Sequence, residues 1–276
     1  MKLPVVWTIS NSDCSSGTGI QSDLQTFKDF EVEGCSVITQ LTAQNSFALG
    51  YSLAIERKSV VAQINALDSD VPANAIKLGA LPNRETVEIV IKYLDDYKGF
   101  VVYDLELETS GEALLAETGD LVRTKLLPRV NLLVINLEEA SALVGTAVSS
   151  PAEIVAAAES LLASGSNMVL ITGAQFAAVE GKRFDYWSDG NEGLWISVNA
   201  YATINNRGGG CVLSAAIAAG IGHGMGMQET LGLAKAYVTQ GISGAHQVGN
   251  GPGAVAHLGW PTSEDHMPEF SKQAPV

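Results

Sequence analysis

The sequence predicts an α/β protein whose mainly parallel sheet is covered by helices on both faces. Two observations lead to this fold class. Short runs of β-branched residues alternate with helical patterns almost from end to end of the 276 residues, and such βα repetition is typical of parallel sheets. The length also fits one large domain of this class. We therefore expect residues 1–276 to form a single domain.

The first half of the chain contains four strand-like runs separated by helical patterns. The runs "PVVWTIS" at 4–10 and "SVITQLTA" at 36–43 are rich in Val, Ile and Thr, which favour strands. Shorter runs of the same kind lie at 75–81 and 100–107. Apolar residues at helical spacing predict helices over 20–30, 58–70 and 83–97. The polar connection that follows the second strand is expected to be irregular.

The second half continues the alternation and then changes pattern. Strands are expected at 131–136 and 167–174, with helices over 137–145 and 151–165. From residue 175 to 200, apolar and polar residues alternate around the turn-rich "SDGNEG", which predicts an antiparallel hairpin. The last expected elements are two helices over 211–224 and 228–245, followed by a polar, Pro-containing and loosely ordered tail over 260–276.

The composition limits the kinds of partner. The formal net charge is −14 and the 16 Lys and Arg residues are scattered, whereas nucleic-acid binding requires a clustered basic face. No apolar run approaches the roughly 20 residues of a membrane span, and the first residues lack the apolar core and cleavage site of a secretory signal. We therefore expect a cytoplasmic protein that binds a small molecule. Three widely spaced cysteines argue against disulfides and structural zinc.

The segment "NNRGGGCVLSAAIAAG", residues 205–220, carries the clearest chemical signal. Glycines in front of a helix let backbone N–H groups approach an anion, and the helix dipole adds roughly half a positive charge there. We predict that Gly208, Gly209 and Gly210 bind a phosphate group. A thiol at a helix N-terminus has a lowered pKa, so Cys211 is a candidate base. Taken alone, the glycines also fit a flexible turn, and the cysteine also fits an inert core residue.

Six segments, in the same order and at compatible spacing, resemble the hydroxymethylpyrimidine and phosphomethylpyrimidine kinases of thiamine biosynthesis. These kinases are members of the ribokinase-like superfamily, which also includes the pyridoxal kinases. The resemblance runs from about Val5 to His257 and implies a ribokinase-like three-layer αβα sandwich. The matching segments are "TISNSDCSSGTGIQSDLQTF", "SVITQLTAQNS", "AIKLGAL", "VYDLELETSG", "INLEEASALVG" and "NNRGGGCVLSAAIAAG".

The resemblance also implies a reaction. Such a kinase transfers the γ-phosphoryl group of ATP to the hydroxymethyl group of an aminopyrimidine, and then to the resulting monophosphate. By their positions in the matching segments, Asp104 and Glu139 would hold Mg²⁺, and Asn136 would lie in the ATP site. Asp23 and Gln44 would contact the pyrimidine. Cys211 matches the family's candidate base, and the family suggests a homodimer.

Several implied site positions depart from the family pattern. In the substrate pocket, Asn11 and Thr18 add bulk where the family has Gly and Ala, whereas Ala80 removes bulk where it has Met. At the ATP site, Thr172 replaces a Lys that would face the phosphates. This replacement predicts weaker ATP binding or slower turnover, since a hydrogen bond to a charged group contributes about 1.5–3 kcal/mol. Arg207 replaces a His and is expected either to restore positive charge or to point to solvent.

Two other functions remain open. A vitamin B6 kinase of the same superfamily would use the same glycine-rich segment and Cys211 with a different heterocycle. A binding or regulatory paralogue would hold a pyrimidine without efficient phosphoryl transfer, as the replacements at Thr172 and Gly209, which stands where the family has Thr, would allow. We favour the enzymes, because the groups that position a phosphoryl group are mostly backbone and survive side-chain change.

Overall fold

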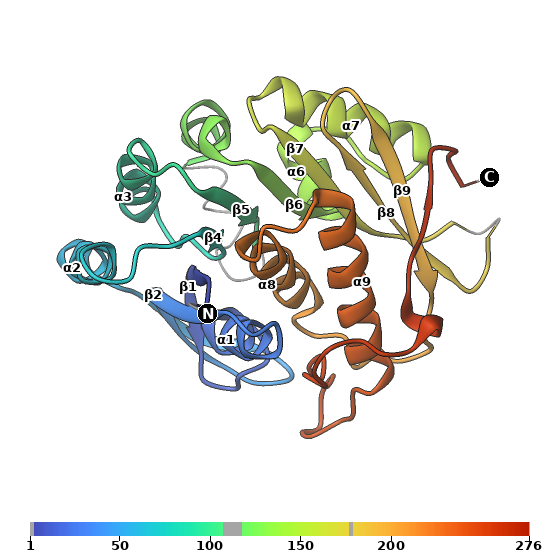
Figure 1. The fold of residues 1–276 in the computed structure, drawn as a ribbon, viewed down its shortest axis with the longest axis horizontal. Coiled ribbons are helices and arrows are strands. Elements are labelled where there is room, and N and C mark those ends of the chain that lie inside the picture. Colours follow the sequence, from blue (N-terminus) through green and yellow to red (C-terminus); the bar gives the residue numbers. More distant parts are fainter. Residues whose placement is uncertain (1–2, 107–117, 177–178, 276) are drawn as a thin grey trace.

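The computed structural model describes residues 3–106, 118–176 and 179–275, and these residues contain a ten-stranded sheet between two layers of helices (Figure 1). The strand order is β10-β9-β8-β7-β6-β5-β4-β1-β2-β3. The strands are β1 (Val5–Asp13), β2 (Glu33–Gln44), β3 (Leu49–Ala54), β4 (Ala75–Leu78), β5 (Phe100–Asp104), β6 (Leu132–Asn136), β7 (Met168–Ala174), β8 (Lys182–Ser188), β9 (Gly193–Asn199) and β10 (Glu269–Ser271).

The centre of the sheet is parallel. Strands β2, β1, β4, β5, β6 and β7 pair in parallel, so their carboxyl ends meet at one edge. Antiparallel strands flank this centre, with β3 beside β2 and the series β8, β9 and β10 beside β7. The predicted strands of the centre and the hairpin β8–β9 are therefore confirmed.

Two short edge strands differ from expectation. The connection after β2 forms β3 instead of an irregular loop, although all six residues of β3 are exposed. Its alternation of Leu49, Tyr51 and Leu53 is too short to distinguish a strand from a loop. The segment 260–276, expected to be loosely ordered, contributes β10, in which Phe270 pairs with Ile196 of β9. In the same segment, the Trp260 ring packs 5.2 Å from that of Phe30. Both strands form because of long-range partners that local sequence does not reveal.

Helices cover both faces of the sheet, as predicted. One layer consists of α1 (Gly19–Asp29), α8 (Gly209–Gly222) and α9 (Met227–Ser243), and Figure 1 shows α8 and α9 side by side in front of the sheet. The opposite layer consists of α2 (Arg57–Asp68), α3 (Arg84–Leu94), α6 (Leu137–Val144) and α7 (Pro151–Ala163). A π-helical turn, η1 (Val122–Leu126), and two 3₁₀ turns, η2 (Leu127–Arg129) and η3 (Glu264–His266), complete the described elements.

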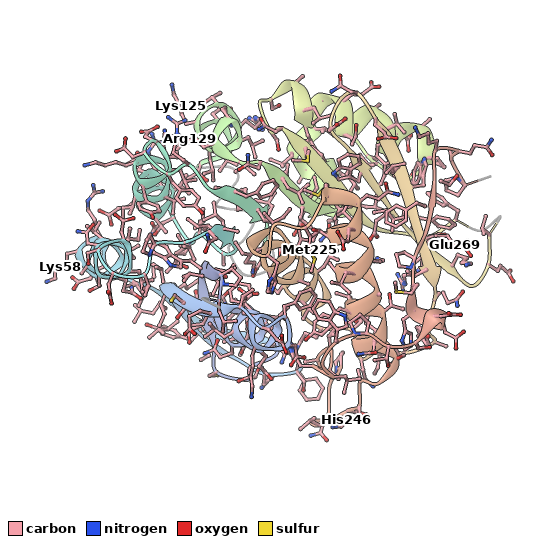
Figure 2. All side chains as sticks on the ribbon, in the orientation of Figure 1. Lys58, Lys125, Arg129, Met225, His246 and Glu269 are labelled. Atoms are coloured by element: carbon pink, nitrogen blue, oxygen red, sulfur yellow. The ribbon has the colours of Figure 1, made fainter. Side chains whose placement is uncertain are left out.

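Alternation along the strands produces two hydrophobic cores, one on each face. In β1, Trp7 and Ile9 point to the layer of α2 and α3, whereas Val6 points to the layer of α1 and α8. Exposed charged side chains such as Lys58, Lys125 and Glu269 lie at the periphery (Figure 2). Within the described residues, no helix is both long enough and apolar enough to cross a bilayer. All three cysteines are free thiols.

A buried ion pair crosses the α1 side of the sheet. Lys77 on β4 and Asp23 on α1 both have 0% exposed side chain, and the Lys77 Nζ lies 3.0 Å from an Asp23 oxygen. Thr8 of β1 donates a further hydrogen bond to Asp23 at 2.5 Å. Because a charge in the protein interior is costly without a partner, this pair fixes α1 against β1 and β4.

We expect Asp23→Ala to lower the free energy of unfolding by about 3 kcal/mol, because it removes the nearest counter-charge of Lys77. Urea unfolding would measure the loss. The exposed Asp70, two residues after α2, provides the control, and Asp70→Ala should stay within about 0.5 kcal/mol of the parent protein. Equal stabilities of the two variants would contradict this account of the pair.

Candidate active site

A cavity of about 400 Å³ opens at the carboxyl ends of β5, β6 and β7, beside the N-terminus of α8. Ligands of open α/β sheets bind at this edge, where strand order changes direction. Here β1 lies between β2 and β4, so the chain passes to the other half of the sheet after β3. The main polar residues that line the cavity are Asp104, Glu106, Asn136, Glu139, Thr172, Arg207 and Cys211.

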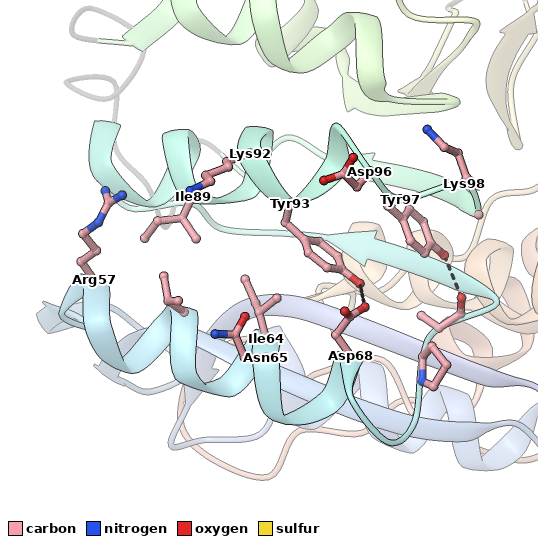
Figure 3. Close-up of a pocket in the computed structure, with 14 residues that line it drawn as sticks. Arg57, Ile64, Asn65, Asp68, Ile89, Lys92, Tyr93, Asp96, Tyr97 and Lys98 are labelled. Atoms are coloured by element: carbon pink, nitrogen blue, oxygen red, sulfur yellow. Dashed lines mark hydrogen bonds between the residues drawn. The ribbon is translucent and has the colours of Figure 1, made fainter.

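A larger hollow of about 750 Å³ lies between α2 and α3 (Figure 3). Its walls include Ala73 and Gly99, which precede β4 and β5, so it lies at the opposite edge of the sheet. Figure 3 shows the Tyr93 hydroxyl directed at Asp68 and the Tyr97 hydroxyl at the Ala73 carbonyl, with hydrogen bonds of 3.0 and 3.2 Å. These two hydroxyls already have protein partners, and the hollow lies away from the edge at which ligands of such sheets bind. We therefore place the candidate active site in the smaller cavity.

Gly208 shapes the start of α8. Its φ of +81° is in the left-handed region, and a Cβ there would collide with the Gly17 carbonyl oxygen. A glycine is therefore required on steric grounds. The Gly209 N–H donates to the Asn206 carbonyl at 3.2 Å. Since the helix begins at Gly209, the first-turn N–H groups of Gly210 and Cys211 have no helical carbonyl a turn earlier and can bind an anion in the cavity.

Two further contacts fix the loop before α8. Arg207 pairs with Ala254 through two backbone hydrogen bonds, from its N–H to Gly253 and from the Val255 N–H to its carbonyl, at 3.2 and 3.0 Å. Its guanidinium donates to Ser15 at 2.8 Å and lies 3.3 Å from Asp13. Arg207 therefore lines the cavity but is held by the loop after β1, instead of pointing to solvent.

Asp13 organises that loop from a fully buried position. Its carboxylate accepts backbone N–H groups of Ser15, Gly17 and Thr18 at 2.7 to 3.0 Å. Burial raises the pKa of Asp13, but hydrogen bonds from Gln44 and Ser15 and the charge of Arg207 outweigh it, so the pKa lies below its ordinary value. The loop 14–18 is thus a rigid wall of the site.

Four ionisable groups meet where β4 and β5 end. Besides Asp23, the Lys77 Nζ lies 3.3 Å from Glu106 and 4.0 Å from Asp104. Although burial lowers the pKa of Lys77, the charge of Asp23 and the other acidic neighbours raise it well above its ordinary value. Burial raises the pKa of Asp23 to about 6 and that of Asp104 to about 7, with Lys77 opposing both shifts. Ser214 of α8 donates to Asp104 at 2.9 Å.

The pKa of Cys211 differs from the sequence-based expectation. Burial, followed by the charge of Glu106, raises this pKa well above its ordinary value. The expected lowering is wrong, because desolvation and nearby carboxylates outweigh the helix N-terminus. Accordingly, the protonated thiol donates to Glu106, with 3.4 Å between Sγ and Oε1.

The predicted ATP and metal residues also line the cavity. Asn136 ends β6 and caps α6, accepting the Glu139 N–H while the Glu139 carboxylate accepts the Asn136 N–H, both at 2.9 Å. Thr172 lies near the end of β7. Among the described residues, Asp104, Glu106 and Cys211 form a group of potential metal ligands, whose ligand atoms lie within 4.8 Å of one another. Glu139 therefore faces the same cavity without joining this cluster.

The predicted substrate residues are placed differently. Asn11, Asp23 and Ala80 have 0% exposed surface, so none of them reaches the cavity in this structure; they form layers beneath it. Asn11 bonds Ser10 and Thr42, and Ala80 bonds Ser10 and Thr39. Gln44 is partly exposed and donates to Thr18 at 2.8 Å, and its contact with a substrate stays a prediction.

Sequence reasoning missed Lys77 and Glu106. Lys77 is the only charged residue in "AIKLGAL", and a lysine in a buried parallel strand indicates buried acidic partners. This signal was available. The sequence signal for Glu106 was weaker. The segment "DLEL" alternates acidic and apolar residues, and this pattern does not show which acid faces a cavity.

We expect part of the pH dependence of stability to come from Asp104. Its pKa of about 7, against an ordinary 3.8, means that the folded state retains a proton which the unfolded chain releases between about pH 4 and 7. The free energy of unfolding therefore falls as the pH rises through this window. In urea unfolding at several pH values, the free energy of unfolding of Asp104→Asn should fall less across this window than that of the parent protein or of Asp70→Asn. Equal falls in all three proteins would contradict the assignment to Asp104.

Comparisons with known proteins identify the family of the chain. The family described as "Phosphomethylpyrimidine kinase" matches residues 13–256. A hydroxymethylpyrimidine/phosphomethylpyrimidine kinase of Streptomyces coelicolor is 34% identical over 263 residues, covering 95% of this chain and 96% of the relative. One of the same name from Rhizobium meliloti is 35% identical over 259 residues, covering 92% and 97%. An ADP complex of Bacillus subtilis pyridoxal kinase superposes with a TM-score of 0.85 at 27% identity, covering 93% of this chain and 98% of that one.

The family match extends over the loop after β1, the ends of the central strands and the N-terminus of α8, which together form the cavity. The ribokinase-like three-layer fold implied by the sequence is confirmed. The chain belongs to the phosphomethylpyrimidine kinase family.

Proposed function

We propose that this protein transfers the γ-phosphoryl group of ATP to the hydroxymethyl group of 4-amino-5-hydroxymethyl-2-methylpyrimidine and then to the monophosphate, as a step of thiamine biosynthesis. The observation that carries the proposal is the position of the Gly210 and Cys211 N–H groups, at the start of α8 and on the wall of the cavity. Family membership supplies the substrate class. Phosphoryl transfer depends mainly on such positioning and on charge neutralisation.

The charge of the cavity supports a role for Mg²⁺. Among the described lining residues, the acids are Asp104, Glu106 and Glu139, and the cation is Arg207, which already pairs with Asp13. A triphosphate would be repelled by this wall without a divalent ion, and carboxylates are the ligands that Mg²⁺ prefers. Asp104 and Glu139 would hold the ion, which neutralises phosphate charge when bound. Asn136, Thr172 and Arg207 would border the nucleotide.

Cys211 contributes through two groups. Its backbone N–H would hold the transferred phosphoryl group, together with that of Gly210. Its thiol, which donates to Glu106, lies on the side of the cavity where the accepting hydroxymethyl group must meet the phosphoryl group. The role of this thiol as a base stays a prediction.

Two glycine variants test the phosphate site. Gly208→Ala would strain a backbone at positive φ and press a Cβ against Gly17, so it should move the adjacent amides and lower turnover by at least about a hundredfold. Gly209→Ala is the matched control, since its Cβ would meet only Val255 at 3.9 Å and its N–H is kept. We expect it to retain most of the turnover in a coupled ADP-release assay.

The same assay separates the candidate functions. Turnover of the hydroxymethylpyrimidine supports the proposal, whereas turnover of pyridoxal alone would assign a vitamin B6 kinase. Ligand binding by calorimetry without turnover of either compound would assign a binding paralogue. Equal activities of the two glycine variants would show that the start of α8 does not hold the phosphoryl group.

We also propose that the enzyme is a homodimer that buries one face of the β2–β3 edge. Leu41 of β2 pairs with Leu53 of β3, and Tyr51 shares that face by strand alternation. These three side chains are 43–62% exposed. Apolar side chains gathered on an edge strand mark an interaction surface, and a second copy of the chain would cover them symmetrically.

Tyr51→Asp should convert the dimer into a monomer, because it places a charge in the proposed apolar contact. Light scattering coupled to size-exclusion chromatography would measure the mass of each species. Ser52→Asp, on the opposite face of the exposed strand β3, should leave the dimer intact. A monomeric parent protein, or a dimer that persists in Tyr51→Asp, would refute this interface.

A further inference from the structure

Glu106 is one of three acids among the described residues that line the cavity. It follows β5 by two residues, its side chain is 10% exposed, and it lines the cavity beside Cys211. Most of its surface is therefore buried, and the remainder faces the space that a ligand would occupy.

Lys77 and Cys211 hold the Glu106 carboxylate through one of its oxygens. Oε1 lies 3.3 Å from the Lys77 Nζ and 3.4 Å from the Cys211 Sγ. The chain at Gly79 passes close by, since a Cβ there would lie 2.7 Å from the same oxygen. Since Lys77 is itself fixed by Asp23, the carboxylate is oriented before any ligand binds. A carboxylate has about four acceptor positions, two on each oxygen, so a ligand N–H can bond to it alongside its protein donors.

The contact with Cys211 places Glu106 relative to the reaction. Cys211 belongs to the first turn of α8, whose N–H groups would hold the phosphoryl group. The accepting oxygen must approach the phosphorus to about 3–3.5 Å, so the hydroxymethyl arm lies close to Cys211. The ring carbon that bears the arm has two neighbours in the ring, and the one that carries a further substituent can then face the Glu106 carboxylate.

The substituent on this neighbouring carbon differs between the candidate substrates. The aminopyrimidine carries an amino group, whose N–H bonds a carboxylate can accept. Pyridoxal carries an aldehyde, whose oxygen can only accept, so two acceptors would face each other without a proton between them. Such a mismatch in a buried site is strongly selective, because it leaves polar groups unpaired.

We propose that Glu106 is the specificity-determining residue of the pocket and accepts a hydrogen bond from the amino group adjacent to the hydroxymethyl arm. Glu106 thus selects heterocycles with a hydrogen-bond donor at that position and disfavours those with a carbonyl. This inference rests on the proposed kinase function and deepens it, since it names the substrate group that is recognised.

The test is a cycle of two changes, one in the protein and one in the ligand. kcat/KM is measured for the parent enzyme and for Glu106→Gln, with the aminopyrimidine and with the same pyrimidine lacking the amino group. The parent enzyme should prefer the amino compound by roughly tenfold to a hundredfold. Glu106→Gln should lose most of this preference. Its kcat/KM should fall for the amino compound and change by less than about threefold for the analogue.

Two controls separate recognition from folding. Glu88→Gln makes the same chemical change in the exposed pair with Arg84 on α3 and should keep the preference of the parent enzyme. Glu106→Val is a second variant that removes the carboxylate. Pyridoxal is the third substrate, and its kcat/KM relative to that of the aminopyrimidine should rise in both Glu106 variants.

The outcomes distinguish this inference from the proposed function. A parent enzyme that phosphorylates none of the pyrimidines refutes the function. A parent enzyme that phosphorylates the pyrimidines but is indifferent to the amino group overturns the role of Glu106, even if every variant fails to fold. Equal losses on both pyrimidines in Glu106→Gln also overturn it, because they would show that the carboxylate acts on the shared hydroxymethyl group or on structure.

Discussion

Lys77 places a positive charge in the middle of a buried parallel strand, and the polar architecture around it follows from that charge. An ammonium group in the protein interior costs several kcal/mol unless acids surround it. Asp23 supplies the first counter-charge from α1, while Asp104 and Glu106 supply others from the end of β5. One buried cation thus connects a helix, two strands and the wall of the cavity.

The second constraint is the approach of two loops at the start of α8. Gly208 passes so close to Gly17 that a side chain at Gly208 is impossible, and Arg207 bridges to Asp13 on the same loop. The helix N-terminus is therefore held rigidly, with its free amides on the cavity wall. The two constraints meet where the Cys211 thiol donates to Glu106, so the phosphate site and the charged cluster support each other.

The site keeps its main-chain groups while its side chains depart from the family pattern. Thr172 supplies no charge, and Arg207 is engaged by Asp13, so the described part of the cavity wall is acidic. Backbone amides and a carboxylate cluster remain able to bind a phosphate with its metal ion. Of the altered residues, Asn11 and Ala80 are buried outside the cavity lining, whereas Thr18, Thr172 and Arg207 line it.

Local sequence determined much of this protein. Periodicity predicted the parallel strands and the helices, since burial of one or both faces imposes it on each segment. The glycines at the start of α8 indicated the proposed phosphate site, because backbone conformation restricts which residues fit there. Tertiary structure alone decided which side chains reach the cavity: Asp23 and Asn11 lie beneath it, whereas Glu106 lies on its wall. It also reversed the expected shift in the pKa of Cys211. In addition, it paired β3 with β2 and β10 with β9. These outcomes depend on groups far apart in the chain, whose burial and electrostatic field exist only after folding.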